Sequence, residues 1–172
     1  MPQLPDQNPI LIAFAIVFNS LSNLPVILYF KMVKDHNVKL SIKNHSGFTM
    51  TYAGDWFDSG RLADDYNWPG TISNDDHQEI LCYERDWSAA GCSGYVQYNM
   101  SGTVLTIAFS NPSVGTNKLG VGTTGKDVWD DMDNHSYQPF VIKITIAGKE
   151  LNFNCQCTGG STNSAEVSIF QA

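Results

Sequence analysis

The sequence predicts an all-β protein: an antiparallel β-sandwich of about eight to ten short strands, preceded by an apolar N-terminal extension. Two observations support this fold class. Apolar and polar residues alternate in many short runs after Met32, as they do in strands with one buried face. In addition, no amphipathic stretch with helical spacing exceeds two turns after Met32, so the pattern lacks the crossover helices that a parallel sheet needs.

The predicted strands follow one another along a single domain. In the first run, VKLSIKN, the apolar residues Val38, Leu40 and Ile42 alternate with polar ones. The same alternation predicts further strands at residues 48–52, 78–83, 95–100, 104–109, 140–146, 151–155 and 165–170. Short turn sequences, such as MSGT at 100–103 and AGKE at 147–150, are typical of hairpins between antiparallel neighbours. With 172 residues, 42% of them apolar, the chain is long enough to build one sizeable core.

We divide the chain into an apolar N-terminal extension, residues 1–36, and a sandwich domain, residues 37–172. No charged residue lies between Asp6 and Lys31, a length sufficient to span a bilayer, but NSLSN and Pro25 split this segment into two shorter runs. A signal peptide would fit the first run, although no Lys or Arg precedes it and no clear cleavage site follows. Residues 1–31 also fit an upstream extension of the reading frame that ends before Met32. Signal, anchor and upstream extension all stay open.

The stretch from Ser110 to Gly125 is predicted to be a surface loop. Pro112 cannot donate a hydrogen bond to a strand ladder, so the preceding strand should end there. The residues that follow are rich in Gly, Ser, Thr and Asn and offer little apolar surface to bury. Long loops are either functional or simply solvated, and this one leads to Trp129 and Tyr137, which lie among acidic residues.

The charge of the chain argues against nucleic acid as a partner. Ten Lys and Arg residues stand against seventeen Asp and Glu residues, which gives a net charge of −7. Nine of the acids lie between Asp55 and Asp86, where only Arg61 and Arg85 oppose them. Such a protein is repelled by phosphate backbones and by anionic membrane surfaces.

The polar residues show no pattern of catalysis or metal binding. The cysteines, Cys82, Cys92, Cys155 and Cys157, lack zinc-site spacing, and the sequence leaves a bond between Cys82 and Cys92 open. The acids of DVWDDMDNH lack the spacing of a calcium-binding loop, and the four histidines stand apart in polar turns. We therefore expect no enzyme activity, no cofactor and no metal.

Three segments, IKNHSGFTM, DSGRL and SAAGCSGYVQYNMSGTVLTIAFSNPSVGTNK, occur in this order. From about Val38 to Ile146 the sequence resembles the aegerolysins, above all the small aegerolysin-type component of bacterial binary insecticidal toxins. The most specific element is a Gly-x-x-Gly approach to a strand, a hairpin, a second strand and then Asn-Pro-x-x-Gly-x-Asn-Lys. The residues that match the family pattern are Asn44, Gly47, Gly60, Arg61, Gly91, Gly94, Asn111, Pro112, Gly115, Asn117 and Lys118.

The resemblance implies an acidic β-sandwich that binds membrane lipid, sphingolipid among the candidates, and perforates membranes, usually with a larger pore-forming partner protein. It also implies a secreted or released protein that acts at target-cell membranes, with cytoplasmic storage before release as an option. Fungal members recognise sphingolipid with a Trp, an acid and a second Trp at positions that here hold Ser59, Ala90 and Val114. The fungal lipid specificity is therefore not expected.

A net-negative protein must find its membrane by stacking on and hydrogen bonding to neutral or zwitterionic headgroups. The residues expected to do so are aromatic and lie near predicted loops or strand ends: Trp56, Phe57, Trp87, Trp129 and Tyr137. For Trp68, packing against the sandwich is the preferred interpretation.

Two alternative functions stay open beside the lipid-binding toxin component. The actinoporins, which are autonomous pore-formers, share the NxSG opening and the MSGTxLxIxFSxP hairpin. Their inserting helix is amphipathic and charged, whereas residues 10–30 here carry no charge. A sandwich lectin that binds glycans without lysis, or a structural or storage protein without a ligand, would fit the same strand pattern.

Overall fold

The computed structural model describes residues 10–18, 25–33, 35–85 and 88–172. The chain divides into two compact units, Met1–Lys34 and Asp35–Ala172. In the first unit, β1 (Ile10–Phe18) and β2 (Pro25–Val33) form an antiparallel hairpin in which Ile10 lies opposite Val33. Among the residues that the structure describes, no helix combines the length and the apolar character needed to cross a bilayer.

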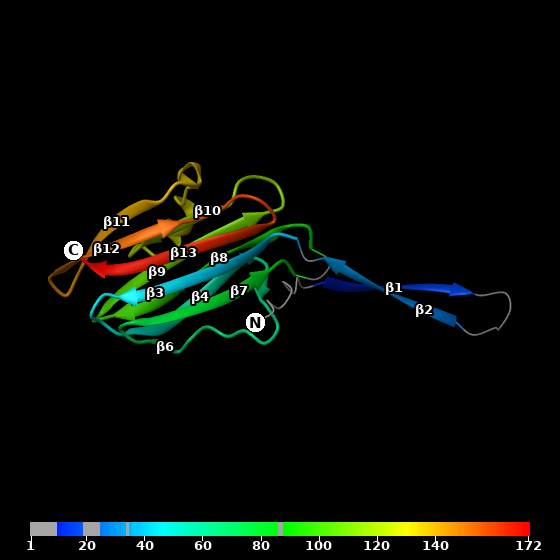
Figure 1. The fold of residues 1–172 in the computed structure, drawn as a ribbon, viewed down its shortest axis with the longest axis horizontal. Coiled ribbons are helices and arrows are strands. Elements are labelled where there is room, and N and C mark those ends of the chain that lie inside the picture. Colours follow the sequence, from blue (N-terminus) through cyan, green and yellow to red (C-terminus); the bar gives the residue numbers. More distant parts are fainter. Residues whose placement is uncertain (1–9, 19–24, 34, 86–87) are drawn as a thin grey trace, which may run out of the picture. The chain divides into compact units, whose positions relative to one another are not determined.

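The second unit is a sandwich of two sheets (Figure 1). The five-stranded sheet has the order β10-β9-β8-β4-β6, and the six-stranded sheet has the order β11-β12-β13-β3-β7-β5. The strands are β3 (Asn37–His45), β4 (Met50–Ser59), β5 (Arg61–Leu62), β6 (Thr71–Ile72), β7 (Asp76–Tyr83), β8 (Gly91–Met100), β9 (Thr103–Pro112), β10 (Lys118–Gly122), β11 (Phe140–Ile146), β12 (Lys149–Gln156) and β13 (Thr162–Gln171). Two short helices, α1 (Lys126–Asp130) and η1 (His135–Tyr137), lie between β10 and β11.

The predicted fold class is confirmed, with one exception to the antiparallel pairing. Two-residue turns join β8 to β9 and β11 to β12, as the MSGT and AGKE sequences predict, and Gly102 and Gly148 adopt the positive φ that such turns require. However, β13 pairs with β3 in parallel, with Thr162 opposite Asn37. The chain thus places its last strand in the middle of the six-stranded sheet, between β12 and β3 (Figure 1).

The core lies between the two sheets and follows the alternation in the sequence. In β3, Val38, Leu40 and Ile42 are fully buried, and the residues between them face outward. Inward-facing residues of β8 and β9, such as Val96 and Phe109, fill the opposite side of the same core. Burial of such apolar side chains contributes about 1.5–3 kcal/mol each to the stability of the sandwich.

The predicted surface loop at residues 110–125 is wrong in its middle, where residues 118–122 form a strand. β9 does end at Pro112, but the loop that follows covers only residues 113–117, and β10 then pairs with β9. The glycines of β10 allow α1 to approach the strand closely. A Cβ atom on Gly120 would lie 2.9 Å from Met132 Cβ, and one on Gly122 would lie 2.8 Å from Val128 Cγ2. These glycines therefore serve close packing and not chain flexibility.

Buried asparagine side chains tie the loops to the two sheets. Asn111 Nδ2 donates to the carbonyl oxygens of Asn37 at 2.7 Å and Ser161 at 2.9 Å. Asn117 Nδ2 donates in the same way to Thr158 and Gly160. At the other end of the sandwich, Asn44 Nδ2 donates to the carbonyl oxygens of Phe48, Ile72 and Ser73. Three of the polar residues in the family pattern thus have a structural role, because each satisfies backbone groups that would otherwise be buried without partners.

The four cysteines are buried free thiols. Cys82 lies in the six-stranded sheet and Cys92 in the five-stranded sheet, and both are fully buried in the core. Burial raises the pKa of the Cys82 thiol well above its ordinary value. Burial likewise raises the pKa of Cys155 to about 12. Both thiols are therefore protonated at neutral pH, and protonated thiols react slowly.

Candidate functional site

The short helix α1 brings an aromatic cluster together on the outer face of the five-stranded sheet. Val128 and Met132 pack on Ala108 of β9, which fixes the helix on the sheet. Trp129 then reaches across to β8, where its Nε1 atom donates to Ser93 Oγ at 2.8 Å. The ring of Trp56 packs edge-on against Trp129, with the ring centroids 5.2 Å apart.

The aromatic cluster consists of Trp56, Tyr95 and Trp129, with the cation of Lys126 above it. The centroids of the Trp56 and Tyr95 rings are 5.6 Å apart. Lys126 Nζ lies 4.7 Å from the centroid of the Trp129 ring and 5.6 Å from that of Trp56. The same ammonium group pairs with Asp130 Oδ1 at 2.6 Å, one helical turn along. The cluster is half-buried, with aromatic surface and a cation at its rim.

The path of β4 decides which of its two neighbouring aromatic residues joins the cluster. The register between β4 and β8 shifts between Tyr52 and Gly54 and again between Phe57 and Ser59. As a result, Trp56 lies opposite Tyr95 on the outer face. Phe57 lies on the inner face, where its ring contacts Phe109 of the core with centroids 5.9 Å apart. The structure thus brings Trp56 and Trp129 together and keeps Phe57 apart from them.

A groove of about 420 Å³ opens beside the cluster. It lies where β4 ends, β8 begins, β9 ends and β10 begins, and Trp129 forms part of its wall. We call it the α1 groove. Its lining residues are Asp58, Ser59, Ala90, Ser93, Ser110, Pro112, Val114, Gly115, Thr116, Lys118, Trp129, Asp130 and Met132.

The α1 groove combines charges of both signs with apolar surface. Asp58 and Asp130 supply carboxylates and Lys118 an ammonium group, while Ser93 and Ser110 supply hydroxyls. Val114, in the loop at residues 113–117 that lines the groove, is 90% exposed. An exposed valine next to a tryptophan and charges of both signs suits a ligand with a zwitterionic head and an apolar body.

The other predicted lipid-binding residues lie elsewhere. Tyr137 in η1 packs against the main core and near Gly159. Trp87 lies outside the described residues. Trp68, for which packing was expected, stacks on Phe57 against the core.

Two glycines of the family pattern, Gly91 and Gly94, have packing roles beside the α1 groove. Gly91 has a φ of +80°, and a Cβ atom there would lie 2.3 Å from the carbonyl oxygen of Asn111. A Cβ atom on Gly94 would lie 2.3 Å from the carbonyl oxygen of Trp56. These glycines let β4 and β9 approach β8 at the end where the groove opens. Arg61 pairs with Asp64 at 2.6 Å and faces the Tyr83 ring, away from the groove.

Sequence reasoning missed Ser93, Tyr95 and Lys126, which complete the site. A Ser and a Tyr two residues apart on a strand share one face, but nothing local indicates that a tryptophan from a later helix lies above them. Lys126 and Asp130 have the i, i+4 spacing of an ion pair on a helix. Because α1 has only five residues, this spacing occurs once and does not by itself predict a helix. Within residues 35–85 and 88–172, no group of three or more His, Cys, Asp or Glu side chains is arranged to hold a metal ion.

Comparison with known proteins identifies the fold. No protein-family model and no curated protein matches the sequence. Among solved structures, the lipid binding protein Nakanori matches with a TM-score of 0.64 and 12% identity over 79% of this chain and 71% of that chain. The RahU protein, solved in complex with a TRIS molecule, matches with a TM-score of 0.50 and 12% identity over 79% of this chain and 93% of that chain. IP-1A from Alcaligenes faecalis matches with a TM-score of 0.49 and 12% identity over 80% and 94% of the two chains. At this identity the first two matches show a shared fold.

Proposed function

We propose that this protein binds membrane lipid through the α1 groove and the aromatic cluster beside it. One observation carries the proposal. Ser59, Ala90 and Val114, the three positions singled out by the resemblance to aegerolysins, come from separate segments and line the same groove as Trp129. The fold shared with the lipid binding protein Nakanori supports the same function.

The groove suits a zwitterionic headgroup better than an anionic one. With a net charge of −7, the protein is repelled by anionic lipids, so attraction has to come from short-range contacts. Asp58 and Asp130 would receive the ammonium end of a headgroup, and Lys118 would receive its phosphate. Small residues at Ser59 and Ala90 leave room that larger side chains would fill.

The apolar rim would enter the interface between headgroups and acyl chains. Val114 is almost fully exposed, and tryptophan prefers the interfacial layer of a bilayer. Trp129 is held by its hydrogen bond to Ser93, so little side-chain freedom is lost on binding. The single variants Trp56→Ala and Trp129→Ala should each weaken membrane binding by about 1–2 kcal/mol.

In this proposal the sandwich recognises lipid and a larger partner protein perforates the membrane. The sandwich uses its inward-facing apolar residues for its own core, so unfolding would be needed before they could cross a hydrocarbon layer of about 30 Å. We further propose that the protein is not an enzyme and acts after secretion or release. An autonomous pore-former of the actinoporin kind is the competing function, and dye release by this chain alone would favour it.

Co-sedimentation with vesicles tests the proposal. The vesicles would contain phosphatidylcholine alone, phosphatidylcholine with sphingomyelin, sphingomyelin with cholesterol, or phosphatidylcholine with phosphatidylserine. Two matched variants separate the α1 groove from general surface hydrophobicity. Val114→Asp places a charge at the groove, while Val141→Asp places the same charge on β11, where Val141 is 57% exposed.

We expect binding to at least one zwitterionic composition, strong loss of it in Val114→Asp, and wild-type binding in Val141→Asp. Equal loss of vesicle binding in both variants would show that an added surface charge weakens binding wherever it is placed. The α1 groove would then not be the binding site. Absence of binding to every composition, by a chain with an intact far-ultraviolet circular dichroism spectrum, would refute lipid binding for this panel.

A further inference from the structure

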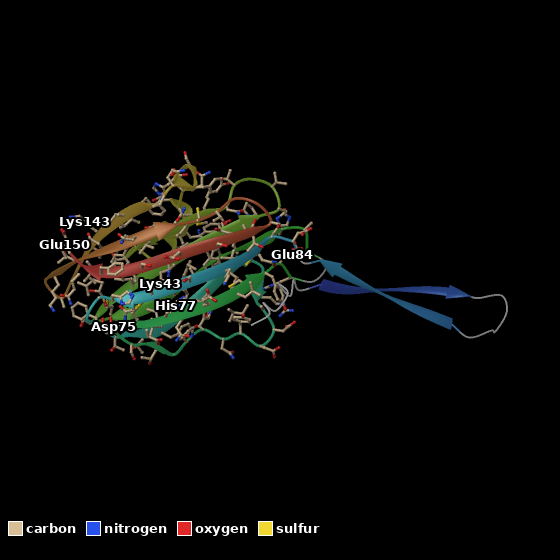
Figure 2. All side chains as sticks on the ribbon, viewed as in Figure 1. Lys43, Asp75, His77, Glu84, Lys143 and Glu150 are labelled. Carbon is tan, nitrogen blue, oxygen red and sulfur yellow. The ribbon has the colours of Figure 1, made fainter. Side chains whose placement is uncertain are left out.

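A second groove lies on the outer face of the other sheet. It has a volume of about 320 Å³ and runs over β3, β7 and β13, with the end of β12 at its side. We call it the β3 groove. Its lining residues are Lys39, Ser41, Lys43, His77, Glu79, Gln156, Thr158, Ser164, Ala165 and Glu166. Figure 2 shows Lys43 and His77 close together on this face.

The groove has a floor of short side chains and walls of long ones. Ser41 of β3 lies between Glu166 of β13 and Glu79 of β7, which are its partners in the two neighbouring strands. Each glutamate leans away from Ser41 toward a lysine of β3. Glu79 pairs with Lys39 at 3.0 Å, and Glu166 pairs with Lys43 at 2.9 Å.

The two ion pairs thus diverge from Ser41 in opposite directions along the strand. Ser41 Oγ is itself hydrogen-bonded to His77 Nε2 at 3.0 Å. These ion pairs join side chains that are 35–49% exposed, so they bias the walls toward the open arrangement before any ligand arrives. Preorganised polar groups lose less entropy on binding than free ones do.

The charges of the groove balance, which determines the kind of ligand it suits. Two lysines stand against two glutamates, so neither an anion nor a cation gains net attraction. Each lysine uses one of its three N–H groups in the ion pair, and Glu79 uses one carboxylate oxygen. Hydroxyls of Ser41, Thr158 and Ser164 and the amide of Gln156 also line the groove. Within the protein, Thr158 Oγ1 donates to the carbonyl oxygen of Thr162 and Gln156 Nε2 to that of Tyr137, which leaves the Ser164 hydroxyl and the Gln156 Oε1 atom as further polar groups for a ligand.

We propose that the β3 groove binds a neutral glycan. Each sugar hydroxyl both donates and accepts a hydrogen bond, so neighbouring hydroxyls of one ring match an ammonium group next to a carboxylate. The volume lies at the lower end of the range for small-ligand sites, which suits one or two sugar rings. This site is independent of the α1 groove, because the two lie on the outer faces of different sheets.

Nuclear magnetic resonance titration of the full chain tests the proposal. The isotope-labelled protein receives glucose, galactose, mannose, N-acetylglucosamine, lactose or maltose up to about 50 mM, which reveals dissociation constants in the millimolar range. Sialic acid and glucosamine serve as charged sugars for comparison. We expect at least one neutral sugar to shift the backbone signals of Ser41, Ser164 and Glu166, and to leave those around Trp129 unchanged.

Substitutions assign any binding to the groove. Ser41→Leu fills the floor and should abolish the shifts, while Glu79→Gln and Glu166→Gln should each weaken binding about three- to tenfold. The matched control is Glu150→Gln, because Glu150 forms a comparable exposed ion pair with Lys143 at 2.8 Å on β11 and β12 (Figure 2). This control should bind as the wild type does.

Three results would overturn the proposal: no neutral sugar shifts these strands, a charged sugar binds more tightly, or Ser41→Leu binds unchanged. Vesicles that carry lactosylceramide, compared with free lactose, tell whether the glycan is recognised on a lipid or in solution. The Val114→Asp variant should keep its sugar-induced shifts even if it no longer binds vesicles, so the two proposals fail separately.

Discussion

Substitution of Gly120 by alanine tests why β10 is rich in glycine. The new methyl group would lie 2.9 Å from Met132 Cβ and 3.0 Å from the carbonyl oxygen of Val128, both closer than carbon and oxygen atoms normally pack. Overpacking of this kind costs about 1–3 kcal/mol. The loss of backbone freedom in the unfolded chain offsets about 0.4–1 kcal/mol of this cost. We therefore expect the free energy of unfolding to fall by about 1–2 kcal/mol.

Thermal unfolding followed by circular dichroism measures this loss as a fall in Tm of about 2–8 °C. Tryptophan fluorescence should change as well, because α1 carries Trp129 and would be displaced from the sheet. The control is Gly70→Ala, since a Cβ atom on Gly70 meets nothing within 4 Å. If Gly120→Ala were as stable as Gly70→Ala, the close packing of α1 on β10 would be refuted and a flexible loop would explain the glycines better.

Three further predictions concern the sandwich. Asn111→Ala removes the donor to two backbone carbonyl oxygens and should lower the free energy of unfolding by about 2–4 kcal/mol in urea titration, whereas the exposed Asn67→Ala should change it little. A chain that begins at Met32 lacks the β1–β2 hairpin but should still fold into a soluble β-sandwich, as judged by far-ultraviolet circular dichroism; if it is insoluble while the full chain is soluble, residues 1–31 belong to the fold. In the folded protein, the hydrogen bond to Asp55 raises the pKa of the Tyr52 phenol from 10.0 to about 12. As the pH rises, the phenol therefore ionises in the unfolded chain before it does so in the folded one, and the free energy of unfolding should fall between these two pH values. The free energy of unfolding of Tyr52→Phe should fall less over this pH range. If the variant and the wild type showed the same dependence on pH, the hydrogen bond between Tyr52 and Asp55 would be refuted.

Alternation predicted most of the fold because many strands bury mainly one face. The runs around Leu40 and Val96 have this pattern, and both residues are fully buried in the structure. β10 could not be predicted in the same way. The outer face of β10 is covered by α1. Gly120 and Gly122 therefore stand where an alternating strand would have polar residues that face the solvent. In sequences, glycine is more common in loops than in strands. Here it is needed because residues further along the chain, Val128 and Met132, pack against β10, and the sequence of β10 alone does not indicate this contact.

The candidate site was predictable only in part. Trp56 and Trp129 were expected to bind lipid, but their contact depends on how α1 folds back onto β8, which no local pattern indicates. Trp56 and Phe57 are neighbours in the sequence, and the register shifts of β4 determine which of the two faces outward. Their common function in lipid binding stays a prediction.

The parallel pairing of β13 with β3 affects when the sandwich can form during synthesis. β3 is the first strand of the sandwich to leave the ribosome, yet its neighbour on one side is the last strand to be made. Until β13 emerges, β3 has a hydrogen-bonding edge without its native partner, and β12 and β3 cannot be joined into one sheet. Closure of this sheet must therefore wait until β13 has been made, and the sequence separation of the two strands favours slow folding. An unfinished chain that exposes such an edge can pair with other chains and aggregate, which is the kind of association that chaperones prevent.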